Sequence, residues 1–200
     1  MIDARRALLA GLWDYAGVFP PAELPLEQAL AEWRRIRTSA DAWLVNRLVV
    51  RSGQVEACGS EPLAIVGGAE ERHDGHVFVE GDTKLRCGGT RVPPAEEVGA
   101  FIRGNLERGT AFKATAGLHH ALPTDGEHGF LNLLAACIWP DDAEILLATR
   151  EIALDANGLR ANGRVADADT CAHMRRGLLH SIGSCSFSEP VGELRQMQIL

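Results

Sequence analysis

The apolar positions of the chain change repeatedly between two patterns: short continuous runs, and runs with helical spacing. The continuous runs are typical of strands whose two faces are both buried. They lie at 42–50, 62–68, 76–80, 83–89, 111–117 and 178–187. Helical spacing predicts helices, two of which end at Gly109 and Pro140. These helices lie at 24–39, 93–109, 129–140, 167–178 and 188–197.

Two further segments complete the pattern. Residues 143–154 fit either a helix or a strand, and the two Asn-Gly pairs within 155–164 predict a surface hairpin or loop. Strands that alternate with helices predict one α/β domain over residues 1–200, with a parallel sheet covered by helices. A full eight-stranded (β/α) barrel takes about 250 residues. We therefore expect a TIM-barrel-like parallel β/α fold in a short or incomplete form, with an open doubly wound sheet as the alternative.

Composition narrows the classes of function. The formal net charge of −7 argues against general nucleic-acid binding, which needs a basic face. No apolar run approaches the roughly eighteen residues of a membrane helix, and the N-terminal residues do not resemble a secretion signal. The five cysteines form no C-x-x-C pair, which indicates reduced thiols and a cytoplasmic protein. We therefore expect neither a nucleic acid nor a membrane as a partner.

Two segments, "TKLRCGG" and "FKATAGL", share one plan. Each holds a lysine in a short strand and a glycine four residues later, Lys84 with Gly88 and Lys113 with Gly117. One helix separates them, so a β–α–β unit is expected to place both lysines side by side at similar height. Repulsion between neighbouring lysines lowers a pKa, and a neutral lysine can form a Schiff base with a carbonyl. The alternative is an outward-facing lysine, or one paired with a buried carboxylate such as Glu80.

The two lysine strands resemble those of deoxyribose-phosphate aldolase and related class I aldolases. The resemblance implies that Lys84 is the Schiff-base lysine, that Lys113 is its pKa-lowering partner and that no cofactor is required. It also implies a phosphate near three glycines: Gly88, Gly89 and Gly117. Arg86 departs from the aldolases, which have a small hydroxyl residue there, and their acidic partner has no clear counterpart.

A broader resemblance spans nearly the whole chain. The landmarks "DYAGVFPPA", "KLRCGG", "FKATAGLHH", "HGFLN" and "GSCSFSEP" follow the same order in a family of bacterial proteins without a settled activity. This resemblance implies a barrel-like fold and little chemistry. The chain looks shorter than that family between "AIVGG" and "KLRCGG", which indicates a missing β/α unit and an incompletely closed barrel.

Three histidines, His119, His120 and His128, follow the second lysine strand. His119 or His120 can act as a general acid–base group, because the pKa of free imidazole is near neutrality. Alternatively, all three bind a divalent metal. A further ligand would then come from a neighbouring acid or thiol: Asp125, Glu127 or Cys185.

Other candidates for ligand binding lie where strands end, because the carboxyl ends of barrel strands build the active site. Asp14 and Tyr15 end the first apolar run, and Arg86 can hold a carboxylate or phosphate through its planar fork. Cys185 precedes a helix start, which favours a thiolate and binds anions. The remaining candidates also lie near strand and helix ends: Thr115, Asn132, Ser184, Ser186 and Glu189.

Three functions are therefore open. The main prediction is an enzyme of lyase, aldolase or isomerase type that uses Lys84 and Lys113 on a small anionic carbonyl compound. The second is a metal-dependent enzyme built on the histidines. The third is a non-catalytic subunit or binding module derived from a barrel. The exposed sheet edges of such an incomplete barrel need covering, in a homo-oligomer or a hetero-complex.

Overall fold

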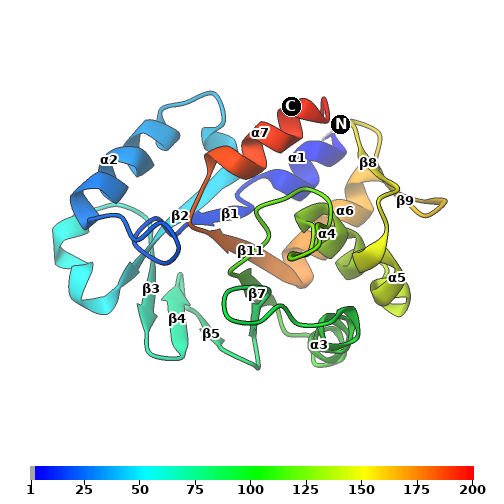
Figure 1. The fold of residues 1–200 in the computed structure, drawn as a ribbon, viewed down its shortest axis with the longest axis horizontal. Coiled ribbons are helices and arrows are strands. Elements are labelled where there is room, and N and C mark those ends of the chain that lie inside the picture. The colour runs from blue at the N-terminus through cyan, green and yellow to red at the C-terminus, as the bar shows by residue number, and fades with distance from the viewer. Residues whose placement is uncertain (1–2) are drawn as a thin grey trace.

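Eight strands of the computed structural model, which describes residues 3–200, form one sheet in the order β5-β4-β3-β2-β1-β11-β7-β6 (Figure 1). They are β1 (Trp13–Tyr15), β2 (Val45–Arg51), β3 (Leu63–Gly67), β4 (Glu70–His73), β5 (His76–Val79), β6 (Lys84–Arg86), β7 (Phe112–Thr115) and β11 (Leu179–Ser184). Only β4 pairs antiparallel with its neighbours, and the other pairs are parallel. The expected α/β fold is confirmed, but the sheet is mixed rather than wholly parallel.

The sheet curls into a nearly closed barrel. Its two edge strands, β5 and β6, follow one another in the chain and meet in an isolated parallel bridge between Glu80 and Lys84. Inside the barrel, Glu71 of β4 contacts both Lys84 of β6 and Lys113 of β7. The barrel is nearly rather than fully closed, and where a β/α unit was expected to be missing the β4–β5 hairpin lies instead, with no helix between β3 and β6.

Strand β4 was not expected, because Glu70–His73 is polar and resembles a loop. Its turn residues, Asp74 and Gly75, both have positive φ, at 48° and 80°. This backbone suits a two-residue hairpin turn, for which Asp-Gly is a favoured sequence. Glu71 and His73 are buried inside the barrel, and the residues between and before them are more exposed. The strand alternates as the pleat requires, but its buried side carries charge and imidazole instead of apolar groups.

Helices pack around the rest of the sheet (Figure 1). They are α1 (Ala4–Leu9), α2 (Leu26–Arg37), α3 (Ala95–Glu107), α4 (Phe130–Ile138), α5 (Ala143–Ala148), α6 (Ala168–Gly177) and α7 (Ser188–Gln196). Every residue of α4 from Phe130 to Cys137 is buried. Phe130 packs edge-on against Trp13 of β1, with ring centroids 5.3 Å apart. In Figure 1, β3, β4 and β5 lie on the side of the sheet where the ribbon shows no helix.

The ambiguous segment 143–154 divides into α5 and the first strand of a small antiparallel sheet. The strands of this sheet are β8 (Ile152–Leu154), β9 (Leu159–Ala161) and β10 (Arg164–Ala166). The predicted hairpin at 155–164 is confirmed. Within residues 3–200, no helix is long and apolar enough to cross a membrane.

The two glycines of the shared lysine plan touch each other. A side chain at Gly88 would place its Cβ 2.9 Å from the Cα and the backbone nitrogen of Gly117. Gly117 itself has a φ of +67°, in the left-handed region that favours glycine. The loops after β6 and β7 can therefore approach closely only because both positions lack a side chain.

We expect Gly88→Ala to lower the free energy of unfolding by about 1–3 kcal/mol, because the added methyl overpacks a backbone contact. Urea unfolding followed by circular dichroism measures the change. Gly53→Ala is the matched control, since nothing lies within 4 Å of a Cβ built there. Equal unfolding midpoints for the two variants would contradict the close loop contact.

Candidate active site

A cavity of about 590 Å³ lies at the end of the barrel where the parallel strands terminate. Its deepest side chains are charged and buried: Glu71, Lys84 and Lys113. The loop after β1 forms one wall through Phe19, Pro20 and Pro21. The polar residues that line it nearer its mouth are Glu80, Arg86, Thr115, His119, Glu127 and Cys185. The predicted location of the site, at the carboxyl ends of the strands, thus coincides with a cavity.

Both lysines of the chain lie in this cavity. Only two of the 20 basic residues in the sequence are lysines, Lys84 and Lys113. They are paired in parallel register on β6 and β7 and are 5% and 1% exposed. The prediction that they lie side by side at the same height is confirmed.

Two buried carboxylates hold these lysines in a lysine–carboxylate network, which consists of Lys84, Glu71, Lys113 and Asp14. Lys113 Nζ donates to Asp14 Oδ2 at 2.5 Å and also to Glu71 Oε1. Lys84 Nζ lies 3.0 Å from Glu71 Oε2. Ser181 Oγ donates to Asp14 Oδ2 at 2.6 Å. Two ammonium groups and two carboxylates therefore neutralise one another inside the barrel.

The network fixes the charge of Lys113. Burial alone would lower the pKa of Lys113, but the carboxylates of Asp14 and Glu71 outweigh it and raise that pKa above its ordinary value. Burial would likewise raise the pKa of Asp14 and of Glu71, but Lys113 outweighs it and lowers both. For Lys113 the direction is opposite to the lowering expected from lysine–lysine repulsion. The reason is the pair of carboxylates in contact with Lys113, Asp14 first and Glu71 second.

Glu80, the expected carboxylate partner of a lysine, lies nearer the mouth of the cavity. Its Oε1 accepts from Arg86 Nε at 3.0 Å, and its Oε2 lies 3.4 Å from the Arg86 Nη2. Both side chains are between two fifths and half exposed. Glu71 takes the buried position instead, and Arg86 reaches the cavity as predicted.

The barrel is closed at its other end by rings. His73, His76, Phe78 and His180 lie with ring centroids 4.7–5.9 Å apart. Burial lowers the pKa of His73 and of His180 to about 4, so both rings are neutral at neutral pH. The charged network is therefore approached from the cavity, because the neutral rings of His73 and His180 and the Phe78 ring fill the opposite end.

Tyr15 and Asn132, two of the predicted ligand-binding residues, do not line the cavity. Successive residues of a strand face opposite sides, so Asp14 faces the barrel interior and Tyr15 faces α2. The Tyr15 hydroxyl donates to Glu32 Oε2 at 2.6 Å. The Asn132 amide donates to two carbonyl oxygens, that of Leu146 at 2.6 Å and that of Thr149 at 2.7 Å. Asn132 therefore ties α4 to the end of α5.

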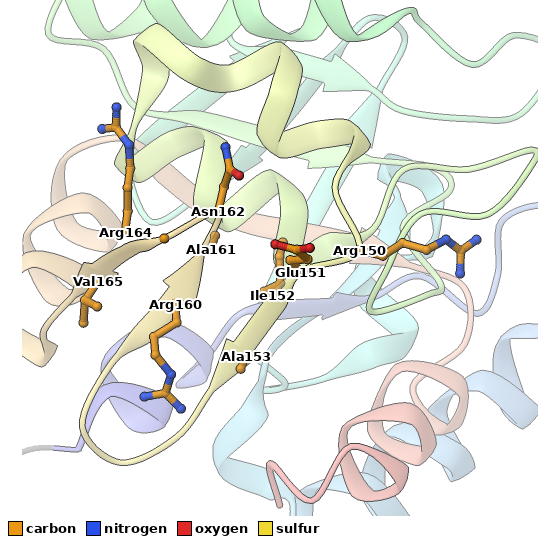
Figure 2. A pocket seen from close by; sticks show the side chains of 10 residues that line it. Arg150, Glu151, Ile152, Ala153, Arg160, Ala161, Asn162, Arg164 and Val165 are labelled. Atoms are coloured by element: carbon orange, nitrogen blue, oxygen red, sulfur yellow. The ribbon is translucent and has the colours of Figure 1, made fainter.

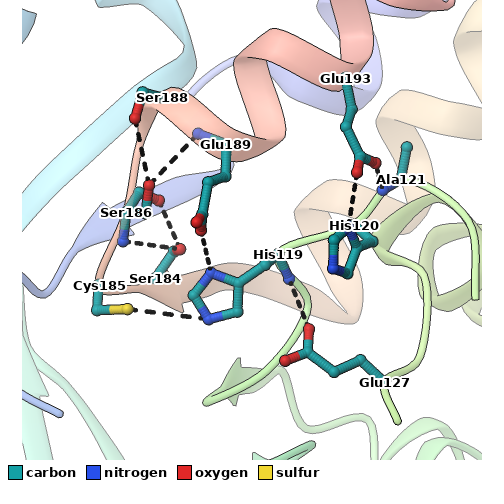
Figure 3. A network of polar contacts seen from close by, with 10 residues as sticks. All are labelled: His119, His120, Ala121, Glu127, Ser184, Cys185, Ser186, Ser188, Glu189 and Glu193. Carbon is teal, nitrogen blue, oxygen red and sulfur yellow. Dashed lines mark hydrogen bonds and ion pairs between the residues drawn. The ribbon is translucent and has the colours of Figure 1, made fainter. Parts of the chain in front are cut away.

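Ser184, Ser186 and Glu189 lie beside the cavity rather than in it (Figure 3). Ser184 Oγ donates to the carbonyl of Ser186 at 2.6 Å. Ser186 Oγ accepts the backbone N–H of Glu189 at 3.3 Å, so it satisfies a free donor of the first turn of α7. Gly88 also does not line the cavity, whereas Gly89 and Gly117 do.

The three predicted metal-binding histidines have three separate partners. His119 Nδ1 lies 2.9 Å from Glu189 Oε2, and its Nε2 lies 3.8 Å from the Cys185 sulfur (Figure 3). His120 Nδ1 lies 2.6 Å from Glu193 Oε1. The remaining ring, His128, has its Nε2 2.7 Å from the carbonyl oxygen of Pro93. These histidines therefore do not converge on one point, and only His119 lines the cavity.

A different set of side chains comes together as a candidate metal site. Asp14, Glu71 and His73 each offer a ligand atom, and these atoms lie within 4.8 Å of one another. Lys113 Nζ already contacts the carboxylates of Asp14 and Glu71. Its ammonium group therefore supplies the positive charge that a metal ion would bring.

A second, more open depression of about 390 Å³ lies on the small sheet (Figure 2). Arg160 and Arg164 line it, and each is paired with an acid, Asp155 or Asp142. These arginines are about half exposed. Paired and solvated arginines are ordinary surface features, so the barrel cavity is the better candidate.

The fold and the cavity together define an α/β protein with a mixed eight-stranded barrel and a buried ionic network at the base of its cavity. No family model, curated protein or solved structure matches this chain.

We expect Lys113→Met to lower the free energy of unfolding by about 3–5 kcal/mol, because the substitution leaves the buried Asp14 carboxylate without a cation and Glu71 with Lys84 alone. Guanidinium unfolding measures it. Arg91→Met is the control: it breaks a solvent-exposed pair with Glu97, for which little or no loss is expected. A small loss for Lys113→Met would show that the network does not stabilise the fold as described.

The same network predicts a pH dependence. The pKa values of Asp14 and Glu71 lie below their ordinary values of 3.8 and 4.5. Their contribution to stability is therefore present above those ordinary values and is lost as the pH falls through the folded-state values. In the wild type the free energy of unfolding should fall below pH 4.5, and the gap to Lys113→Met should narrow. A gap that stays constant from neutral pH to acid unfolding would refute this.

Proposed function

We propose that this chain is an enzyme of lyase, aldolase or isomerase type that acts on a small anionic carbonyl compound in the barrel cavity. One observation carries the proposal. The only two lysines of the chain lie in register at the base of the cavity and share a buried carboxylate, Glu71. A pair of amines with a carboxylate between them can form a Schiff base and move the protons that this requires.

Their surroundings give the two lysines different roles. Lys113 contacts two carboxylates, and its raised pKa keeps it charged. Lys84 contacts one, Glu71, at 3.0 Å. An amine must be uncharged to attack a carbonyl, so Lys84 is the nucleophile and Glu71 accepts its proton. This assignment matches the aldolase resemblance, and Glu71 provides the acidic partner that could not be identified there.

The proposed reaction begins when Lys84 Nζ adds to the carbonyl carbon. Loss of water, with a proton from Glu71 to the leaving oxygen, gives a positively charged Schiff base. That charge draws the electron pair of the neighbouring C–C or C–H bond toward nitrogen as the bond breaks, which gives an enamine. The Glu71 carboxylate accepts the released proton, either from the carbon or from the hydroxyl of the departing carbonyl fragment. Protonation of the enamine and addition of water to the resulting iminium carbon then release the product and restore the Lys84 amine. The Lys113 ammonium group keeps Glu71 in place between the two amines. No cofactor is needed for these steps.

Three features support an anionic substrate. Arg86 lies at the cavity with its guanidinium paired to Glu80, and a carboxylate or phosphate of the substrate can replace that partner. His119 is also cationic at neutral pH, because its pKa is raised to about 9. The contact with Cys185 raises this pKa most, burial lowers it, and the carboxylates of Glu127 and Glu189 raise it further. The backbone at Gly89 and Gly117, and Thr115, complete this wall.

The alternative of a non-catalytic module has less support. It depended on exposed sheet edges, and β5 and β6 meet through the Glu80–Lys84 bridge. The oligomeric state stays a prediction. Size-exclusion chromatography with light scattering measures it directly.

Borohydride trapping tests the Schiff base. The protein is mixed with each member of a panel of 2-oxo acids and phosphorylated aldehydes and ketones, reduced, and mapped by mass spectrometry. We expect an adduct at Lys84 with at least one compound, and none in Lys84→Arg, which keeps the positive charge beside Glu71 but cannot form an imine. The backbone amino terminus is an internal measure of nonspecific labelling. A full panel without an adduct at either lysine would refute the proposal, and an adduct confined to Lys113 would reverse the two roles.

A further inference from the structure

One thiol of the chain differs from the other four. Cys185 is partly exposed and lines the cavity, whereas the other cysteines are buried. The buried cysteines are Cys58, Cys87, Cys137 and Cys171. Burial raises the pKa of each of these four thiols, so they stay protonated at neutral pH. Cys185 is therefore the thiol that a molecule in the cavity can reach.

Cys185 faces an oriented histidine. Its sulfur lies 3.8 Å from His119 Nε2, and the opposite ring nitrogen of His119 lies 2.9 Å from Glu189 Oε2 (Figure 3). The backbone N–H of His119 donates to Glu127 Oε2 at 3.3 Å. The order of nucleophile, acid–base group and orienting carboxylate is the arrangement that activates a cysteine. The three members come from the end of β11, the loop after β7 and the first turn of α7.

The backbone around this group is unusual on both sides. Ala116 and Leu118, just before His119, have φ values of +59° and +62°, which residues other than glycine seldom adopt. Ser186, just after Cys185, holds the first turn of α7 through the Glu189 N–H. Strained backbone of this kind persists where the surrounding structure holds it, and it gathers at functional sites.

We propose that Cys185, His119 and Glu189 form a second nucleophilic centre on the same cavity, which accepts an acyl group from a small ester or thioester. The centre goes beyond the Schiff-base function, because it forms a bond to sulfur and uses neither lysine.

The proposed step balances as follows. The Cys185 thiolate attacks the acyl carbon, a C–S bond forms, and the bond from that carbon to the leaving oxygen or sulfur breaks. His119 gives its Nε2 proton to the leaving group. Water then attacks the acyl-cysteine while His119 takes a proton from it. The C–S bond breaks, the carboxylic acid leaves, and the thiolate and the imidazolium are restored.

Several ionisable groups surround this centre and set its pH dependence. His119 from the loop after β7 contacts Cys185, Tyr15 from β1 interacts electrostatically with it, and Glu127 and Glu189 act through His119. The pKa of His119, about 9, keeps its acidic proton available at neutral pH. The rate of acyl transfer should therefore decline as the pH rises through that value.

The test uses p-nitrophenyl acetate at pH 7. We expect release of p-nitrophenolate and one acetyl group at Cys185, with a rate about 100-fold lower in His119→Gln, the size typical of a lost acid–base group. Cys185→Ala should carry no acetyl group on any thiol while folded, although its four remaining thiols should react after unfolding. His173→Gln is the matched control, because this exposed histidine of α6 lies outside the cavity.

Two results would overturn the proposal. One is acetylation that spares Cys185. The other is a His119→Gln rate equal to that of the wild type, provided that thermal unfolding shows both proteins folded. The two proposals stay separate because mass spectrometry of the wild-type protein scores them on different residues. Acetyl groups are sought on Cys185 and reduced carbonyl adducts on Lys84, and either can be absent while the other is observed.

Discussion

The mutual neutralisation of Lys113, Asp14 and Glu71 inside the barrel is the interaction on which the rest of this structure depends. A charge in a protein interior is costly unless an opposite charge and hydrogen bonds accompany it. Asp14 lies 99 residues and Glu71 42 residues from Lys113 in sequence, so this requirement links three distant strands. A barrel that placed β1, β4 or β7 in another register would leave one of these charges buried without a partner. The network therefore specifies the nearly closed barrel as well as the base of its cavity.

The β4–β5 hairpin makes this arrangement possible in a short chain. It supplies two strands without a helix between them, and it brings a carboxylate opposite the two lysines. The glycine contact between Gly88 and Gly117 keeps the loops after β6 and β7 together above the same lysines. The cavity thus depends on the polar strand β4 and on the two glycines at positions 88 and 117. None of these features adds apolar side chains to the core.

The repeated lysine–glycine plan was enough to predict the β–α–β unit, the common height of Lys84 and Lys113 and their place at the strand ends, because all three follow from local pattern. Because adjacent residues of a strand face opposite sides of the sheet, it could also have been predicted that only one of Asp14 and Tyr15 faces the barrel interior. Glu71 could not be chosen from hydrophobic pattern, since β4 buries charge where a strand normally buries apolar groups. The Asp74-Gly75 pair is the local feature from which the hairpin could have been predicted. Glu71 meets Lys84 and Lys113 only because the sheet curls into a barrel, and a local sequence pattern does not show how the sheet curls. Asn132 was misplaced for a similar reason, because its partners on α5 and Thr149 are fixed by tertiary packing.

The scarcity of lysine has a consequence beyond the cavity. All basic side chains of this sequence other than histidine and the two buried lysines are arginines. Enzymes that acetylate, methylate or ubiquitinate lysine side chains therefore find no substrate on the surface of the folded protein. Such marks could be added only at the base of the cavity, so a cell that modified this chain at lysine would do so at the site itself.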